Sequence, residues 1–168
     1  MLGAMQDWPL RVSTLIDHAA KYHRNRPIVG RSAEGPYVET TWAGVHAAAR
    51  KVAQALNHLG CGSGDAIGVM AWNTPRHMEV WYGVSGCGAI LHTLNPRLFS
   101  EQLDYIINHA GDRVVMVEPD LVKVLEPLVP QLGTVEKWVV LTERANMPQT
   151  TLPDAIAYDE LLAMADGD

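Results

Sequence analysis

The chain has 168 residues, of which 48% are hydrophobic and 19% charged, and its formal net charge is −6. This balance is typical of a globular domain with a buried core and excludes a disordered chain. No apolar run approaches the roughly 18 residues that a membrane span needs, and the first residues lack the pattern of a signal peptide. The 2 cysteines cannot form a disulfide framework. We therefore expect a cytoplasmic protein, in a reducing compartment.

Charge is distributed unevenly along the chain. Residues 1–97 contain nine Lys or Arg and six Asp or Glu, whereas residues 98–168 contain four and thirteen. A nucleic-acid-binding domain normally has a basic face and an excess of positive charge, so we expect no nucleic-acid partner. We interpret the acidic second half as solvated helix and tail surface.

The first part of the chain predicts a helix, a hairpin and a longer helix. The first helix begins near Ser13, a suitable N-cap, and ends at the NRP sequence of residues 25–27. The segments PIVGR and PYVETTW predict two short strands around SAEG, a hairpin-like unit. Thr41 is placed to cap the longer helix, which Gly60 ends.

From residue 66 onwards, apolar segments alternate with helical patterns. The continuous apolar runs at 66–72 and 89–94 predict strands buried on both faces, and RVVMVEP and VEKWVVL predict two further strands. The helices between them are expected to begin at Pro75 and at Ser100, followed by a short one in LVKVLEPLV. This alternation predicts an α/β fold, a mostly parallel sheet flanked by helices, preceded by the short helix and hairpin.

The alternation weakens after residue 141. The sequence continues as TERANMPQTTLPDA and then as the acidic YDELLAMADGD. We expect residues 1–141 to form the α/β unit and residues 142–168 to form an irregular acidic segment.

No familiar catalytic motif is complete. GCGSGD at 60–65 has G-x-G-x-G spacing and joins a helix to a strand, unlike the dinucleotide fingerprint. GVSGCG at 83–88 has a cysteine where a nucleophile elbow needs glycine. No G-x-x-x-x-G-K-[ST] loop occurs, and the histidines and the two cysteines do not make up a complete four-ligand zinc motif. We predict no catalytic residue and no metal ligand in this chain.

Three stretches nevertheless carry a resemblance to a known family. They are TTWAGVHAAARKVAQALNHLGCGSGDAIGVMAWN (40–73), RHMEVWYGVSGCGAILHTLNPRLFSEQLDYIINHAGDRVVMVEPD (76–120) and LGTVEKWVVL (132–141). In order and spacing they resemble the N-terminal part of the acyl-adenylate-forming, or AMP-binding, enzymes. The strings HTLNPRL and MLGAMQDWPL most resemble medium- and long-chain fatty-acid–CoA ligases, and a related branch acts on 3-methylthiopropionate.

The resemblance implies a two-step reaction for the complete enzyme. A carboxylate attacks the α-phosphate of Mg-ATP to give acyl-AMP and pyrophosphate, and the CoA thiol then displaces AMP. The family performs this chemistry with a TSGTTGxPKG-type phosphate loop, downstream adenine- and ribose-binding motifs and a C-terminal lysine, none of which this sequence contains. We therefore expect an N-terminal fragment that is inactive alone, with residues 142–168 leading toward the missing ATP-binding core and with no tightly bound cofactor.

Binding residues are expected where strands of an open α/β sheet end, in the turns after Trp72, Leu94 and Glu118. The resemblance places the turn after Leu94 and the segment after the next strand near the CoA nucleotide, which would implicate Asn95 and Arg97 in the former and Lys123 in the latter. The alternative is a plain turn at Asn95–Pro96, with Arg97 in a surface ion pair.

Other polar and aromatic residues are open to two interpretations. His92, inside an apolar strand, is either a hydrogen-bonded core residue or a pocket-lining group. His77, Trp81 and Tyr82, at helical spacing, are interpreted as packing residues rather than as acyl-chain contacts.

The resemblance also suggests homodimerisation or self-association through the N-terminal domain. Besides an inactive fragment, three other interpretations of the chain remain open. They are a non-catalytic binding or oligomerisation module, the front half of a split enzyme, and a free-standing nucleotide-binding domain.

Overall fold

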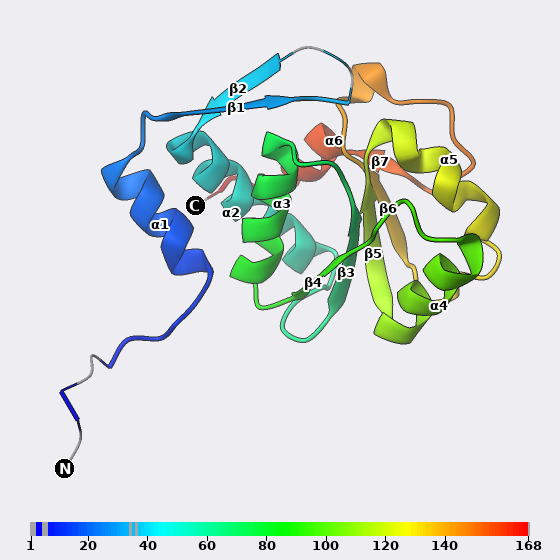
Figure 1. The fold of residues 1–168 in the computed structure, drawn as a ribbon, viewed down its shortest axis with the longest axis horizontal. Helices are drawn as coiled ribbons and strands as arrows, with labels where there is room; N and C mark the ends of the chain where they lie inside the picture. Colours follow the sequence, from blue (N-terminus) through cyan, green and yellow to red (C-terminus); the bar gives the residue numbers. More distant parts are fainter. Residues whose placement is uncertain (1–2, 5–6, 34, 36, 168) are drawn as a thin grey trace.

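The computed structural model describes residues 3–4, 7–33, 35 and 37–167. A parallel five-stranded sheet in the order β4-β3-β5-β6-β7 is flanked by helices, and an antiparallel hairpin, β1-β2, lies beside them (Figure 1). The main sheet comprises β3 (Ala66–Met70), β4 (Ile90–Thr93), β5 (Asp112–Val117), β6 (Lys137–Val140) and β7 (Ile156–Ala157). The expected α/β class with a parallel sheet is confirmed.

The remaining elements follow the order expected from the sequence. The hairpin consists of β1 (Pro27–Arg31) and β2 (Tyr37–Thr41). The α-helices are α1 (Ser13–Tyr22), α2 (Trp42–His58), α3 (Pro75–Gly86), α4 (Ser100–Ala110), α5 (Val122–Leu125) and α6 (Tyr158–Leu162). Short 3-10 turns occupy Pro119–Leu121, Glu126–Leu128 and Arg144–Asn146. No helix in the described part of the chain is long and apolar enough to cross a membrane.

Both faces of the sheet are covered, and each has its own apolar core. On one face, α2, α3 and α6 pack on side chains such as Ile67, Met116 and Leu141; on the other, α4 and α5 pack on Val115 and Val140 (Figure 1). Because neighbouring residues of a strand point to opposite faces, β3, β5 and β6 must be apolar at successive positions. This two-sided burial explains the continuous apolar runs at these three strands.

The structure corrects two expectations about the sheet. The strand at 89–94 is not buried on both faces, because β4 is an edge strand and Ile90 is 55% exposed. Residues 142–168 are not irregular throughout, because β7 pairs in parallel with β6, and Tyr158 and Leu161 of α6 join the core. β7 has two residues and α6 has five, so both are too short to show a clear periodic pattern. The polar residues around them therefore indicated an irregular segment.

The helix ends partly confirm the expected caps. The Thr41 hydroxyl accepts a hydrogen bond from the Gly44 N–H at 3.1 Å, and Gly60 adopts a left-handed φ of 75° after α2, as expected. Ser13 and Ser100 are not N-caps, because each is already the first helical residue. At α4, the Gln102 side chain instead accepts from the Phe99 N–H at 3.1 Å.

The hairpin is confirmed, with Pro27 paired to Thr41 and Arg31 to Tyr37. The turn of this hairpin includes residues 34 and 36, which lie outside the described residues, as do residues 1, 2, 5 and 6 of the opening string MLGAMQDWPL.

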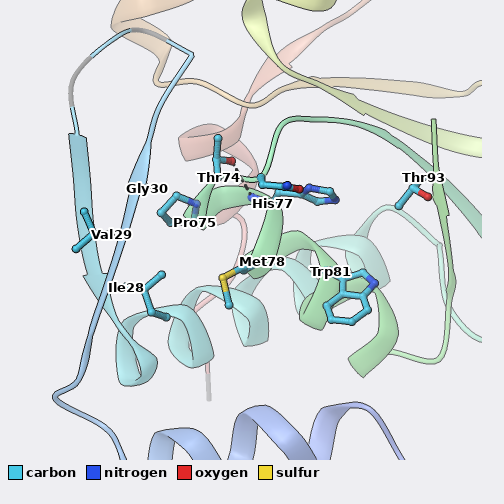
Figure 2. A pocket seen from close by; sticks show the side chains of 10 residues that line it. Ile28, Val29, Gly30, Thr74, Pro75, His77, Met78, Trp81 and Thr93 are labelled. Atoms are coloured by element: carbon cyan, nitrogen blue, oxygen red, sulfur yellow. Dashed lines mark hydrogen bonds between the residues drawn. The ribbon is translucent and has the colours of Figure 1, made fainter. Parts of the chain in front are cut away.

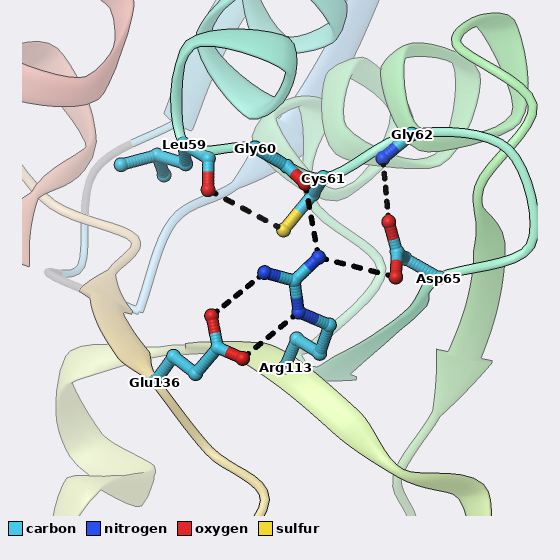
Figure 3. Close-up of polar contacts among 7 residues, drawn as sticks. All are labelled: Leu59, Gly60, Cys61, Gly62, Asp65, Arg113 and Glu136. Atoms are coloured by element: carbon cyan, nitrogen blue, oxygen red, sulfur yellow. Dashed lines mark hydrogen bonds and ion pairs between the residues drawn. The ribbon is translucent and has the colours of Figure 1, made fainter.

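Arg113 joins three segments at the amino-terminal end of the sheet (Figure 3). Its guanidinium donates to Glu136 at 2.8 and 3.0 Å and to the Gly60 carbonyl at 2.9 Å, and it forms an ion pair with Asp65 at 3.1 Å. Asp65 in turn accepts from the Gly62 N–H at 2.8 Å, and these contacts hold its pKa below the usual range. GCGSGD is therefore a helix end and turn, as expected.

The close approach of α2 and α3 depends on Gly83. A Cβ atom at this position would lie 2.6 Å from the Cβ of Val52 and 2.8 Å from the Ala49 carbonyl oxygen. Neither atom can move aside by side-chain rotation, since the Val52 Cβ is bonded directly to the backbone and the Ala49 oxygen belongs to it.

We expect Gly83→Ala to destabilise the fold by about 1–3 kcal/mol, because α3 must move away from α2. Gly86→Ala is the matched control, since Gly86 is in the same helix and nothing lies within 4 Å of its added Cβ. It should change stability by less than about 0.5 kcal/mol. Urea unfolding followed by circular dichroism measures both, and equal losses would contradict this account of the helix contact.

Candidate functional site

A cavity of about 570 Å³ opens at the carboxyl-terminal edge of the sheet (Figure 2). The N-terminal half of α3 forms its floor, the hairpin strand β1 one wall, and Thr93 at the end of β4 another. In open α/β sheets, ligands bind beyond this edge of the strands. The lining consists of Ile28, Val29, Gly30, Asn73, Thr74, Pro75, His77, Met78, Trp81 and Thr93.

Thr74 connects the cavity to the sheet. It precedes α3, where its hydroxyl accepts a hydrogen bond from the His77 N–H at 3.2 Å and donates to Glu118 at 3.1 Å. Glu118, which follows β5, is only 1% exposed. Thr74 is therefore the N-cap of α3 and also the partner of a buried acidic group on a neighbouring strand.

His77 faces the cavity in a defined orientation. Its Nδ1 lies 3.0 Å from the Trp72 carbonyl oxygen, which can only accept, so Nδ1 carries the proton of the hydrogen bond. Burial lowers the pKa of His77, because the protonated imidazole loses its hydration. At neutral pH the ring is accordingly neutral and its Nε2 is a hydrogen-bond acceptor.

Two further contacts hold this edge together. The Trp72 indole N–H, after β3, donates to Asp120 at 3.0 Å, and the Arg76 guanidinium donates to the Leu141 carbonyl, after β6, at 3.0 Å. The start of α3 is thus connected to the ends of several strands, and the position of the cavity floor is determined by the sheet.

Glu79 and Tyr158 form a buried pair behind this edge. The Tyr158 hydroxyl donates to Glu79 at 2.8 Å and connects α6 to α3. Burial raises the pKa of the Glu79 carboxyl, and burial together with the nearby Glu79 charge raises the pKa of Tyr158.

His92 forms a hydrogen bond that spans three strands. Its Nδ1 lies 2.8 and 3.0 Å from the two carboxylate oxygens of Asp112, which is fully buried at the start of β5. Gly68 of β3 lies between them, and a Cβ there would come within 2.7 Å of an Asp112 oxygen. Burial raises the pKa of Asp112, and the bond to His92 counteracts this effect. His92 is therefore half-buried and hydrogen-bonded to a buried carboxyl, and its neighbour Thr93 lines the cavity.

Asn95 and Arg97 lie together in an exposed turn after β4. The Asn95 side-chain oxygen accepts from the Arg97 N–H at 3.0 Å, which forms an Asx turn. Lys123 is exposed on α5, and the described residues show no hydrogen bond or ion pair between it and either of the other two.

The sequence indicated the turns after Trp72 and Glu118 as binding positions but did not single out Thr74, Glu118 or Asp112 as site residues. Thr74 precedes Pro75, and a threonine before a first-turn proline is the one signal that could have identified this cap. His77 and Trp81, interpreted as packing residues, instead line the cavity, and Trp81 is 43% exposed. Among the described residues, no three His, Cys, Asp or Glu side chains gather as metal ligands would.

The sequence profile of the AMP-binding enzymes matches residues 16–163. The chain belongs to the AMP-binding enzyme family. The family resemblance carried by the three stretches is thereby confirmed.

Curated relatives of this AMP-binding chain include CoA ligases. A 3-methylmercaptopropionyl-CoA ligase of Ruegeria pomeroyi is 43% identical over 166 residues, which cover 99% of this chain and 31% of that protein. A medium-chain-fatty-acid–CoA ligase of Ectopseudomonas oleovorans is 37% identical over 99% of this chain and 30% of its own length. The chain thus spans less than a third of the length of these relatives.

A solved structure confirms the fold of the AMP-binding chain. An anthranilate CoA ligase in complex with anthranoyl-AMP superposes with a TM-score of 0.79 at 19% identity, over 98% of this chain and 30% of that one.

In this AMP-binding chain, we expect His92→Ala to cost about 1–3 kcal/mol near neutral pH, because the buried Asp112 carboxyl loses its hydrogen-bond partner. The loss should shrink in acid, where the Asp112 carboxyl can take up a proton. His46→Ala is the matched control: His46 lies 3.0 Å from Asp17, which is 63% exposed, so its removal should cost less than about 1 kcal/mol. Chemical denaturation at two pH values measures both, and a His92→Ala cost as small as the control's would contradict the buried pair.

Glu79 predicts a pH dependence of stability. Its folded pKa is raised, so folding favours the protonated carboxyl, and stability should fall as pH rises through the raised pKa. Glu79→Gln retains an oxygen to accept from Tyr158 but has no charge. We expect this variant to lose that decline, which begins above about pH 4.5, the ordinary value for a glutamate carboxyl. Urea unfolding at a series of pH values measures the slope, and an unchanged slope would mean that Glu79 is not its source.

Proposed function

We propose that this chain is the N-terminal part of a fatty acyl-CoA ligase. Such a ligase converts a carboxylic acid, ATP and CoA into acyl-CoA, AMP and pyrophosphate through an acyl-adenylate. The observation that carries the proposal is the 43% identity to the Ruegeria pomeroyi ligase, which extends over 99% of this chain. Two relatives are named for different acids, 3-methylmercaptopropionate and medium-chain fatty acids. We therefore assign the substrate as a short- or medium-chain carboxylic acid.

The chain alone should be inactive. It contains no Ser/Thr/Gly-rich phosphate loop, so the donors that would neutralise the phosphates of ATP are absent from this sequence. Mg²⁺ prefers carboxylate and phosphate oxygens, and the described residues offer no acidic cluster for it. ATP and its magnesium ion would be held by parts of the complete enzyme outside residues 1–168, toward which we propose that the segment after residue 141 leads.

CoA is the reactant that residues of this chain could contact. Its phosphates are anionic, and Arg97 and Lys123 present exposed cationic groups on the connections that follow β4 and β5. The Asx turn at Asn95 orients the backbone that carries Arg97. The residues thus fit an anionic ligand by charge and exposure, and we propose Asn95, Arg97 and Lys123 as CoA contacts.

Two further properties are proposed for the complete protein. The free thiols of Cys61 and Cys87 suit a cytoplasmic location. Exposed apolar side chains such as Leu15 and Tyr22 on α1 could contact a second copy, consistent with self-association as a homodimer.

A chimera tests the proposed function. We expect the Ruegeria pomeroyi ligase to keep thioester-forming activity when this chain replaces its matching segment, whereas the 168-residue chain alone gives no ATP–pyrophosphate exchange with octanoate. In the chimera, Arg97→Ala should raise the KM for CoA by about tenfold, because one charge-assisted contact is lost, and leave the KM for ATP unchanged.

The control variant is Arg31→Ala, an exposed arginine on the hairpin, which should change neither KM. A folded but inactive chimera would contradict the proposed function. Robust exchange by the chain alone would contradict only its proposed inactivity, and an unchanged KM for CoA in Arg97→Ala would contradict only the CoA assignment.

A further inference from the structure

One face of α3 forms the cavity floor instead of packing in the core. Thr74, His77, Met78 and Trp81 follow the i, i+3, i+4, i+7 spacing that places side chains on one face of a helix. All four line the cavity, and the remaining lining residues come from the hairpin, from the ends of β3 and β4, and from Pro75 (Figure 2). The cavity is therefore the place where this helix face remains available to a ligand.

The cavity is uncharged. Its ten lining residues include no Asp, Glu, Lys or Arg, and its one titratable side chain is the neutral imidazole of His77. A phosphate or carboxylate placed here would lose hydration without gaining a counter-ion, which costs free energy. The anionic reactants of the proposed ligase are therefore poor ligands for this cavity, and charge complementarity favours an uncharged molecule.

The polar groups of the cavity define what an uncharged ligand should offer. The Thr74 hydroxyl is already engaged as both donor and acceptor, and the Nδ1–H of His77 is engaged with the Trp72 carbonyl. Two further polar lining residues, Asn73 and Thr93, are exposed to solvent, whereas His77 is half-buried. Its remaining Nε2 is an acceptor, which a hydroxyl or amide N–H can satisfy. Around it lie the apolar surfaces of Met78, Trp81 and Ile28.

The hairpin wall and the helix floor of the cavity pack directly against each other, so the cavity is preformed. A Cβ on Gly30 would come within 2.6 Å of the Pro75 Cδ, which shows that β1 rests directly on the first turn of α3. The volume of about 570 Å³ lies within the range of small-molecule sites, which are mostly apolar with a few placed polar groups.

We propose that this cavity binds an uncharged amphipathic molecule, an apolar chain or ring bearing one hydroxyl or amide donor, whose donor bonds to Nε2 of His77 while its apolar part packs on Trp81 and Met78. None of the proposed CoA contacts lines this cavity, and the ligand we propose for it is not a reactant of the proposed ligase.

Matched eight-carbon probes test the charge and the donor separately. Octan-1-ol should bind the 168-residue chain at least about tenfold more tightly than octanoate or octylammonium, because each ion loses hydration and the cavity lining offers it no counter-ion. It should also bind more tightly than its isomer 1-methoxyheptane, which has no donor. Titrations followed by NMR of the tryptophan indole N–H signals give the dissociation constants, and the Trp81 signal, assigned with Trp81→Phe, should move.

Three variants locate the binding. His77→Phe should abolish the preference for octan-1-ol over 1-methoxyheptane, since the acceptor is lost while a planar ring is kept. Trp81→Ala should raise the dissociation constant of octan-1-ol about tenfold, because the apolar contact with the indole ring is removed. The control is Tyr105→Ala, which should have no effect, because Tyr105 is an exposed aromatic residue on α4 outside the lining.

Three results would overturn the proposal: tighter binding of octanoate, no binding of octan-1-ol up to its solubility limit, or binding that neither cavity variant weakens. Trp81 is partly exposed, so its substitution should leave the fold intact, and circular dichroism verifies this. If Trp81→Ala did not fold, the comparison of octan-1-ol with 1-methoxyheptane in His77→Phe would still test the proposed site. None of these outcomes bears on the chimera's ligase activity, so the two proposals fail independently.

Discussion

The carboxyl-terminal edge of the sheet depends on the hydroxyl group of Thr74. As an acceptor it satisfies the His77 N–H in the first turn of α3, and as a donor it satisfies the buried Glu118 that follows β5. Both functions of one hydroxyl are used, so the start of the helix and the ends of two neighbouring strands share a fixed geometry. The cavity floor, the orientation of His77 and the position of Pro75 against the hairpin all follow from this contact.

Burial on both faces of the sheet determines where charge can be placed. Side chains within β3, β5 and β6 are almost all apolar, so ionic groups gather at the ends and at the β4 edge. The Arg113 cluster is at the amino-terminal end, and the His92–Asp112 pair is made possible by the missing side chain of Gly68. The carboxyl-terminal cavity contains none of these charges. This separation gives the molecule one end stabilised by ion pairs and another suited to uncharged contacts.

The sequence match over residues 16–163 establishes membership of the AMP-binding family, and the solved CoA ligase structure supports the architecture. The relatives that match nearly all of this chain are CoA ligases more than three times as long. The matched part of this chain consists of two apolar cores around a parallel sheet, whose carboxyl-terminal edge is held by hydrogen bonds from several strands.

The sequence by itself determined the α/β class, the order of elements through β6, the hairpin, the Thr41 cap and the family. These properties depend on local periodicity, on single capping residues and on motif spacing, all of which are readable along the chain. Only the tertiary structure decided that β4 is an edge strand, that β7 and α6 complete the sheet, and that His92 pairs with Asp112. It also brought His77 and Trp81 to a cavity wall. Each of these outcomes depends on which strands are neighbours, and strand order involves contacts between residues far apart in sequence, such as Thr74 and Glu118.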